Sequence, residues 1–204
     1  MLKKAYEERK NTIKGRLEEF KKVKSDDDIF SELCFCLLTP QSRAKNCWAA
    51  VLRMKENNLL HNGSENDILP LLNGVRFPTN KAKYIINVRE NFPVVKEKLL
   101  SNIVTHANAY ELREWLVENV KGFGYKEASH FLRNIGFSGL AILDRHILKN
   151  LARHGVINEI PKTLTKKKYL EIEECMKRFS SSSDIPLDEL DLLFWSMETG
   201  EVFK

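Results

Sequence analysis

The hydrophobic pattern of the chain is that of a series of amphipathic α-helices. Apolar residues recur three to four positions apart over most of the sequence, and no segment shows the alternation expected of a half-buried strand. Two such stripes flank Gly122–Gly124, and they consist of Leu112, Trp115, Leu116 and Val120 before it, and Ala128, Phe131, Leu132 and Ile135 after it. The pattern therefore predicts an all-α protein with a helix, a short hairpin and a second helix at this point of the chain.

The other helices follow from the same spacing and from capping signals. Ser25, followed by three aspartates, is predicted to cap a helix through Leu38 that is apolar nearly all round and therefore buried. Residues 93–107 are predicted to be a less regular link, and Ser180–Ser183 a flexible join. Further helices are expected over 2–22, 43–57, 65–72, 80–91, 109–120, 126–135, 145–154, 163–179 and 187–197.

The hairpin between the two central helices has the composition of an anion-binding turn. Gly122 and Gly124 can adopt positive φ without strain, and they lack the Cβ that would hold another molecule away from the backbone. The start of the next helix offers free N–H groups and a positive dipole end, which favour a phosphate. Lys126, His130 and Arg133 are predicted to share the face of that helix opposite its apolar stripe.

Lys126 lies in the first turn of the second helix, where the helix dipole disfavours a cation. One interpretation is that its long stem carries the charge into water. The other is that the amine is a nucleophile, which must lose its proton to react. The spacing within the helix leaves both interpretations open.

The composition permits a nucleic-acid partner and gives no sign of a metal centre. The 204 residues are 43% hydrophobic and 30% charged, with a formal charge of +5, which is enough for a substantial core and for attraction to phosphate. The four cysteines fit no zinc or disulfide spacing, so we expect free thiols in a reducing, cytoplasmic compartment. We find no signal peptide and no apolar run of membrane length, and we expect no membrane association.

The motif Gly122–Ala128, answered by Leu143–His146, resembles the helix-hairpin-helix DNA glycosylases of the endonuclease III superfamily. In that family a lysine directly follows the hairpin, and an aspartate follows it at a fixed distance; here Asp144 comes eighteen residues after Lys126. Many members have Leu-Pro before the first glycine, where this chain has Val120-Lys121. Over its whole length the chain looks most like the type-2 8-oxoguanine DNA glycosylase/AP lyases, which are prokaryotic repair enzymes.

The resemblance implies two helical lobes with a DNA-binding cleft between them. One lobe would be residues 25–138, ending in the helix-hairpin-helix, and the other would combine 1–24 with 139–204. It also implies a monomer that binds double-stranded DNA containing 8-oxoguanine at the nucleoid. Endonuclease III itself holds an iron–sulfur cluster on four clustered cysteines, and because those ligands are absent here, we expect no cluster, no other metal and no organic cofactor.

The resemblance also assigns roles to individual residues in the reaction. Lys126 would attack the sugar and form a Schiff base that permits β-elimination, and Asp144 would stabilise positive charge on the sugar. Asp144 is equally explained as a plain N-cap, and the two roles are compatible. Gly122, Phe123 and Gly124 would bring backbone groups to the DNA.

Further candidate residues come from two loops and the C-terminus. Gln41 is either a plain turn residue or, as the resemblance implies, a DNA-binding residue near the flipped nucleotide. Arg76 is expected to contact DNA, and Lys81 and Lys83 could meet phosphate. Phe77 either packs into the core or, as the resemblance implies, enters the duplex and fills the gap left by an extruded base or packs against that base, in the manner of the apolar wedges of proteins that unstack DNA. Trp195 lies off the apolar stripe of the last helix, which is formed by Leu187, Leu190, Phe194 and Met197. It either packs against another helix or, as the resemblance implies, recognises the damaged base together with Lys204.

Two other functions are compatible with the sequence. A sister glycosylase would act by the same chemistry on another lesion, such as an oxidised pyrimidine; the Trp195 and Lys204 ending favours 8-oxoguanine. A helix-hairpin-helix module that only binds DNA would tolerate the loss of Lys126, and it does not explain the spacing to Asp144.

Overall fold

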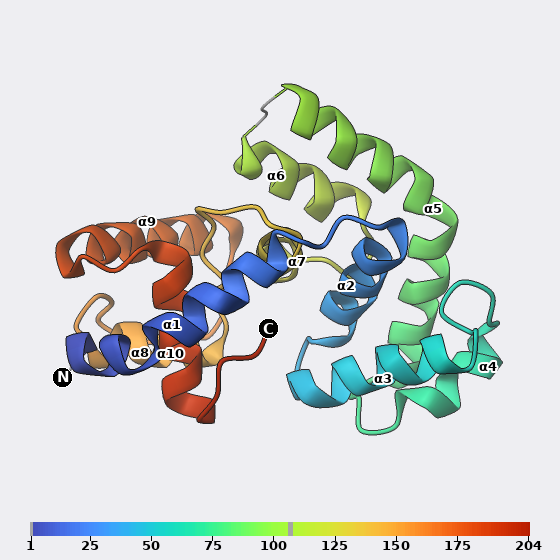
Figure 1. The fold of residues 1–204 in the computed structure, drawn as a ribbon, viewed down its shortest axis with the longest axis horizontal. Coiled ribbons are helices and arrows are strands. Elements are labelled where there is room, and N and C mark those ends of the chain that lie inside the picture. Colours follow the sequence, from blue (N-terminus) through green and yellow to red (C-terminus); the bar gives the residue numbers. More distant parts are fainter. Residues whose placement is uncertain (1, 106–107) are drawn as a thin grey trace. The chain divides into compact units, whose positions relative to one another are not determined.

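The computed structural model describes residues 2–105 and 108–204 (Figure 1). It describes their side chains as well, except those of residues 102–105. Over these residues the chain is helical and contains no β-strand, which confirms the all-α prediction. None of the described helices is long and apolar enough to cross a membrane. The helices are α1 (Leu2–Phe20), α2 (Asp26–Leu38), α3 (Ala44–Glu56), α4 (Glu65–Ile68), η1 (Leu69–Leu72), α5 (Pro78–Thr105), α6 (Ala109–Asn119), α7 (Tyr125–Asn134), α8 (Arg145–Arg153), α9 (Lys166–Ser183) and α10 (Leu187–Thr199).

The chain forms two compact units. One is Lys24–Phe131, and the other joins Met1–Val23 to Leu132–Lys204. The change from the first unit to the second therefore falls inside α7, seven residues before the boundary at 138 that we expected from the sequence.

The unit Lys24–Phe131 is built around α2. Ser25 caps this helix by accepting a hydrogen bond from the backbone N–H of Asp28, as predicted. Every residue from Phe30 to Leu38 is buried, because α2 packs against both α3 and α5 (Figure 1). Burial on all sides explains why this segment has no polar face.

Helix α5 continues through the segment that we predicted to be irregular. It runs from Pro78 to Thr105 with Pro93 in its interior, so the prediction for 93–105 was wrong, and 106–107 lie outside the described residues. Proline removes one hydrogen bond from a helix and usually breaks it. Here Val88, Val95 and Leu99 lie on the buried side of the helix, and their packing outweighs that loss.

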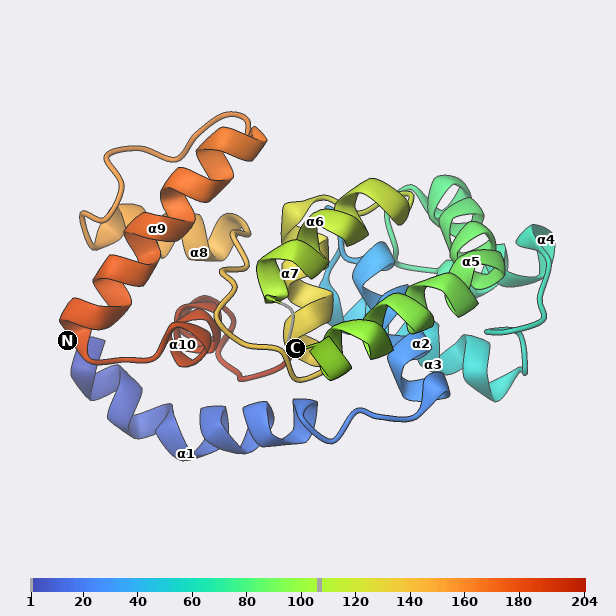
Figure 2. The same ribbon diagram turned by 90° about the horizontal axis from the view of Figure 1, so that it is seen from above.

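The second unit has α10 at its centre, in contact with α1, α8 and α9 (Figure 2). Tyr6 of α1 donates a hydrogen bond of 2.7 Å to Glu189 of α10, and both are buried. The buried face of α10 is wider than the predicted stripe. Within that stripe, Leu190 and Phe194 are buried and Leu187 and Met197 are half-buried. Outside it, Leu192 and Leu193 are buried as well.

Helix α9 also differs from its predicted end. The flexible join expected at Ser180–Ser183 is the last turn of the helix, and that prediction was wrong. The serine hydroxyls donate to helix carbonyls or, for Ser180, to Ile185 O at 2.6 Å. The helix ends instead at Asp184, which adopts the left-handed conformation with φ +56°.

Candidate active site

The hairpin between α6 and α7 is as tight as its glycines indicated. Val120 is the C-cap of α6, and the N–H of Phe123 donates back to Val120 O at 3.0 Å. Gly122 has φ +99°, and a Cβ built on it would lie 2.6 Å from Cδ2 of Tyr84 on α5. Glycine is therefore required here both by the backbone conformation and by the close approach to α5.

The hairpin groups that we expected to reach DNA already have partners within the protein. The side chain of Phe123 is buried, with its ring 6.0 Å from that of Phe131, and its backbone N–H is the one that donates to Val120 O. The N–H of Gly124 donates to Oε2 of Glu127 at 3.3 Å. A phosphate at this N–H would have to displace the Glu127 carboxylate.

Lys126 extends from the first turn of α7 toward the end of α2. Its Nζ donates a hydrogen bond of 3.0 Å to Oγ1 of Thr39, the C-cap residue of α2. Oε1 of Glu127 lies 3.7 Å from the same Nζ, and the lysine side chain is 21% exposed. The amine is thus held by a neutral hydroxyl and is still accessible from solvent.

The helix face shared by Lys126, His130 and Arg133 is not a solvated face. His130 and Arg133 are 5% and 4% exposed, so the face opposite the apolar stripe is itself covered by the protein. The His130 ring packs edge-on against Phe35 at 5.4 Å. Arg133 pairs with buried Asp191 at 3.1 Å, which neutralises its charge within the second unit. Of these three side chains, only that of Lys126 remains accessible.

Gln41 lies in a strained turn directly after α2. Thr39, Pro40, Gln41 and Ser42 form a β-turn closed by a 3.0 Å hydrogen bond from Ser42 N to Thr39 O. Gln41 has φ +55° and is exposed. A proline in the second position and a positive φ in the third define a type II turn, in which glycine or asparagine normally takes the third position.

The loop before α5 carries the exposed aromatic that the sequence left undecided. Phe77 is 51% exposed, so it does not pack into the core. Its φ is +56°, and the guanidinium of Arg76 lies 5.4 Å from its ring centroid. An exposed ring on a left-handed backbone indicates function, because both features cost free energy in the isolated protein.

Lys81 was expected to meet phosphate, and that expectation was wrong. Its side chain is buried, and its amine donates hydrogen bonds to Leu38 O and Pro40 O, each at 2.7 Å, and to Oγ of Ser42 at 2.9 Å. Lys83 is exposed, as a phosphate contact requires. Nothing in the neighbouring residues indicates that Lys81 is internal, because lysine is among the residues least often buried.

Asp144 is the N-cap of α8, in the second unit. One of its oxygens, Oδ1, accepts hydrogen bonds from the N–H groups of His146 at 2.7 Å and Ile147 at 2.8 Å. Among the described residues, the other oxygen, Oδ2, has no hydrogen-bond partner. The cap fixes the carboxylate in place and leaves one oxygen for another molecule.

Trp195 and Lys204 belong to the same unit as Asp144. Trp195 on α10 is half-buried, and its ring stacks against that of Phe203 with centroids 6.3 Å apart. The C-terminal segment therefore covers part of the tryptophan ring, and it ends at half-buried Lys204. Within the unit Lys24–Phe131, in contrast, the structure groups Lys126 with Thr39, the Gln41 turn and the Arg76–Phe77 loop.

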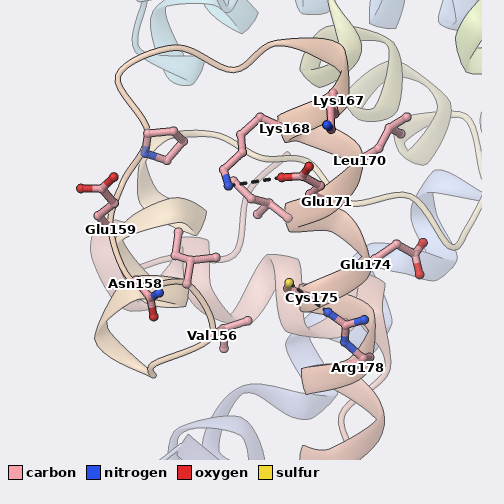
Figure 3. Close-up of a pocket in the computed structure, with 13 residues that line it drawn as sticks. Val156, Asn158, Glu159, Lys167, Lys168, Leu170, Glu171, Glu174, Cys175 and Arg178 are labelled. Carbon is pink, nitrogen blue, oxygen red and sulfur yellow. Dashed lines mark hydrogen bonds and ion pairs between the residues drawn. The ribbon is translucent and has the colours of Figure 1, made fainter.

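A surface pocket lies elsewhere, between α9 and the segment 156–161 (Figure 3). None of the site residues predicted from the sequence lines this pocket. Lys168 and Glu171 in its wall form an ion pair of 3.3 Å. Its ionic side chains are mixed in sign, namely Glu159, Glu171 and Glu174 with Lys167, Lys168 and Arg178, so it does not favour a ligand of either charge.

Comparisons with known proteins identify the family. The family model described as 8-oxoguanine DNA glycosylase matches residues 13–185. The 8-oxoguanine DNA glycosylase/AP lyase of Fusobacterium nucleatum is 47% identical, over 100% of this chain and 96% of that protein. The crystal structure of the Thermotoga maritima 8-oxoguanine DNA glycosylase has a TM-score of 0.86 at 34% identity, covering 100% of this chain and 96% of the other. A Methanocaldococcus jannaschii glycosylase/lyase in complex with a 15mer DNA containing 8-oxoguanine has a TM-score of 0.82 at 40% identity, covering 98% of each chain.

Proposed function

Because this chain belongs to the 8-oxoguanine DNA glycosylase family, we propose that it excises 8-oxoguanine from double-stranded DNA and then cleaves the strand at the resulting abasic site. The observation that carries the proposal is Lys126 itself. It is an accessible amine directly after the hairpin, held by the Thr39 hydroxyl and followed by the capped carboxylate of Asp144.

The first step is removal of the base. The damaged nucleotide must leave the helical stack, because its glycosidic carbon is shielded within the duplex. The neutral amine of Lys126 attacks C1′ of the sugar, and the electron pair of the glycosidic bond leaves with the base, which takes up a proton. The free oxygen of Asp144 stabilises positive charge on the sugar as this bond breaks.

The second step is strand cleavage. Opening of the sugar ring converts the bond between Lys126 and C1′ into a Schiff base. Loss of a proton from C2′ then expels the 3′ phosphate by β-elimination, and water hydrolyses the Schiff base to release the enzyme. The amine and the carboxylate supply all of this chemistry, so the proposal calls for no metal and no organic cofactor.

Recognition uses residues of both units. Arg76 and the Gln41 turn contact the DNA, and Phe77 enters the duplex or packs on the extruded base, supported by its exposure. Trp195 stacks on the damaged base, and the C-terminal Lys204 contributes hydrogen bonds to it. We propose that the protein acts as a monomer. Its action on the chromosome of a prokaryote is supported by its basic charge and by relatives from bacteria and archaea.

The test is borohydride trapping on a panel of duplexes containing 8-oxoguanine, an oxidised pyrimidine or no lesion. We expect a covalent complex with the wild-type protein on the 8-oxoguanine duplex, and none with Lys126→Gln, while DNA binding survives. Lys168→Gln, the same change at an exposed site, serves as the control.

Each alternative has its own result in this experiment. A trapped complex at wild-type yield with Lys126→Gln would show that another group is the nucleophile. Preferential trapping on the oxidised pyrimidine would identify a sister glycosylase. If the wild-type protein binds DNA but forms no trapped complex on any duplex, the protein is a helix-hairpin-helix module that only binds DNA.

A further inference from the structure

Lys81 is the least accessible lysine in the neighbourhood of the proposed nucleophile, and all of its donors are used. It is 3% exposed. An ammonium group has three N–H donors, and here they go to Leu38 O, Pro40 O and Oγ of Ser42. A buried cation is costly unless it is fully hydrogen-bonded, so these contacts account for how α5 can hold a charge in the core.

Two of these acceptors determine the conformation of the Thr39–Ser42 turn. Type I and type II turns differ by a flip of the central peptide, which here joins Pro40 to Gln41. The bond from Lys81 to Pro40 O fixes the direction of this carbonyl. It therefore holds the peptide in the orientation that leaves Gln41 at positive φ, a conformation that is unfavourable for a non-glycine residue.

The same turn presents the acceptor for Lys126. The hydroxyl of Thr39 donates its proton to Cys36 O at 2.9 Å, so its oxygen is left to accept from Nζ of Lys126 at 3.0 Å. The backbone carbonyl of Leu38, next to Thr39, is one of the atoms held by Lys81. The position of the Thr39 hydroxyl therefore depends on the buried ammonium.

Ser42 extends the network to the loop that carries the exposed ring. Its Oγ accepts from Lys81 and also from the backbone N–H of Arg76 at 2.9 Å. Lys81 is also one turn of helix beyond Phe77, whose carbonyl accepts from its backbone N–H at 3.2 Å. One side chain thus connects the end of α2, the strained turn and the start of α5.

The charge of Lys81 faces few counter-charges. Cys47 on α3, Lys126 and Glu127 on α7, and Arg76 in the loop are the ionisable groups around it. Burial, followed by repulsion from Lys126 and Arg76, lowers the pKa of Lys81 to about 8, against the opposing effects of Cys47 and Glu127. Burial raises the pKa of Cys47 to about 11, so the thiol is neutral at physiological pH and the ammonium is held mainly by neutral oxygens.

We infer that Lys81 is a positioning residue, whose buried ammonium holds the Thr39–Ser42 turn in the conformation that presents a hydrogen-bond acceptor to Lys126. The inference rests on the proposed role of Lys126 as the nucleophile. It adds a residue that touches neither DNA nor the reacting atoms and yet sets where the attacking nitrogen lies.

The test compares two cations of α5 that donate to backbone carbonyls, namely Lys81, which is buried, and Arg89, which is half-buried. Arg89 also donates to three carbonyls, Leu59 O, Leu60 O and Gly63 O, in a turn that carries no proposed site residue. Lys81→Met and Arg89→Met each remove one cation of α5 and its hydrogen bonds, so the two variants are matched within one unit. The rate to measure is single-turnover β-elimination on a duplex with a preformed abasic site, which requires Lys126 but no base recognition, together with the Kd for that duplex.

We expect Lys81→Met to slow this step about 10- to 100-fold with little change in Kd, because a misplacement of about 1 Å costs a rate of that order. Arg89→Met should stay within about threefold of the wild type at the same folded fraction. A wild-type rate for Lys81→Met, or equal losses in the two variants, would overturn the inference.

A second pair of variants decides the question if Lys81→Met does not fold. Thr39→Val removes the acceptor while keeping the shape, and Thr39→Ser keeps the hydroxyl. We expect the valine variant to be slow and the serine variant to recover most of the rate; a wild-type rate in Thr39→Val would overturn the inference. Lys126→Gln, run in parallel, tests the nucleophile alone, so failure of the proposed function is distinguished from failure of this inference.

Discussion

Alanine at Gly122 tests whether the hairpin depends on both the backbone angle and the contact with α5. The new Cβ would lie 2.6 Å from Cδ2 and 3.0 Å from Cγ of Tyr84. Cγ lies near the base of that side chain, so a small rotation of the ring does not remove the clash, and either the hairpin or α5 must shift. The residue would also have to keep φ +99°, which an L-amino acid with a Cβ rarely adopts.

The expected cost has two parts. A left-handed backbone costs a non-glycine residue about 1–2 kcal/mol. Overpacking a close contact adds about 1–3 kcal/mol. Gly122→Ala should therefore lower the free energy of unfolding by about 2–5 kcal/mol. Gly155→Ala is the control for the first part alone, because Gly155 has φ +69° and nothing within 4 Å of its Cβ position.

Urea unfolding of both variants, and of Gly122→Ala combined with Tyr84→Ala, separates the two parts. The double variant should recover the overpacking part, so that the coupling energy of the two changes is about 1–3 kcal/mol. DNA affinity of Gly122→Ala should fall as well, because the hairpin backbone moves. If Gly122→Ala loses no more stability than Gly155→Ala, or if removal of the Tyr84 ring recovers nothing, the steric argument is refuted.

Two further predictions follow from the site and from the buried ammonium. Trp195→Ala, and separately the removal of Lys204, should strongly lower excision of 8-oxoguanine while cleavage of a preformed abasic site largely survives; equal losses on both substrates would mean that these residues only support the fold. Because the pKa of Lys81 is lowered to about 8, the folded protein binds fewer protons than the unfolded chain between pH 8 and the ordinary lysine pKa. The free energy of unfolding should therefore rise with pH in that window by about 3 kcal/mol relative to Lys81→Met, and parallel pH curves for the two proteins would contradict this.

The regular part of the fold could be predicted from local patterns. The cap at Ser25, the buried α2 and the two helices around the hairpin depend on residues close in sequence, and the structure has them where expected. The errors at Pro93 and Ser180–Ser183 share a cause. Both segments contain residues that disfavour helix in isolation, and contacts or hydrogen bonds within the folded unit override that preference.

The candidate site was less predictable, because its polar contacts join distant segments. Lys126 and Gln41 were predicted as site residues from the hairpin motif and the family resemblance, but nothing local indicates that Lys81 is buried or that Thr39 accepts from Lys126. These bonds span about forty to ninety residues of sequence, as in Lys81 to Pro40 and Lys126 to Thr39. Local patterns in a single sequence do not report hydrogen bonds between distant residues, and a lysine is expected on the surface by default.

The exposed ring of Phe77 affects the free-energy difference between the free protein and its proposed complex with DNA. Its ring is 51% exposed and its backbone is left-handed, so in the free protein the residue contributes less stability than a glycine would. In the proposed complex, burial of the ring against DNA recovers apolar free energy, at about 25 cal/mol per Å². On that proposal, the residue raises the free energy of the unbound protein and lowers that of the bound one. Stability of the free protein does not account for this residue, whereas the difference between the two states does.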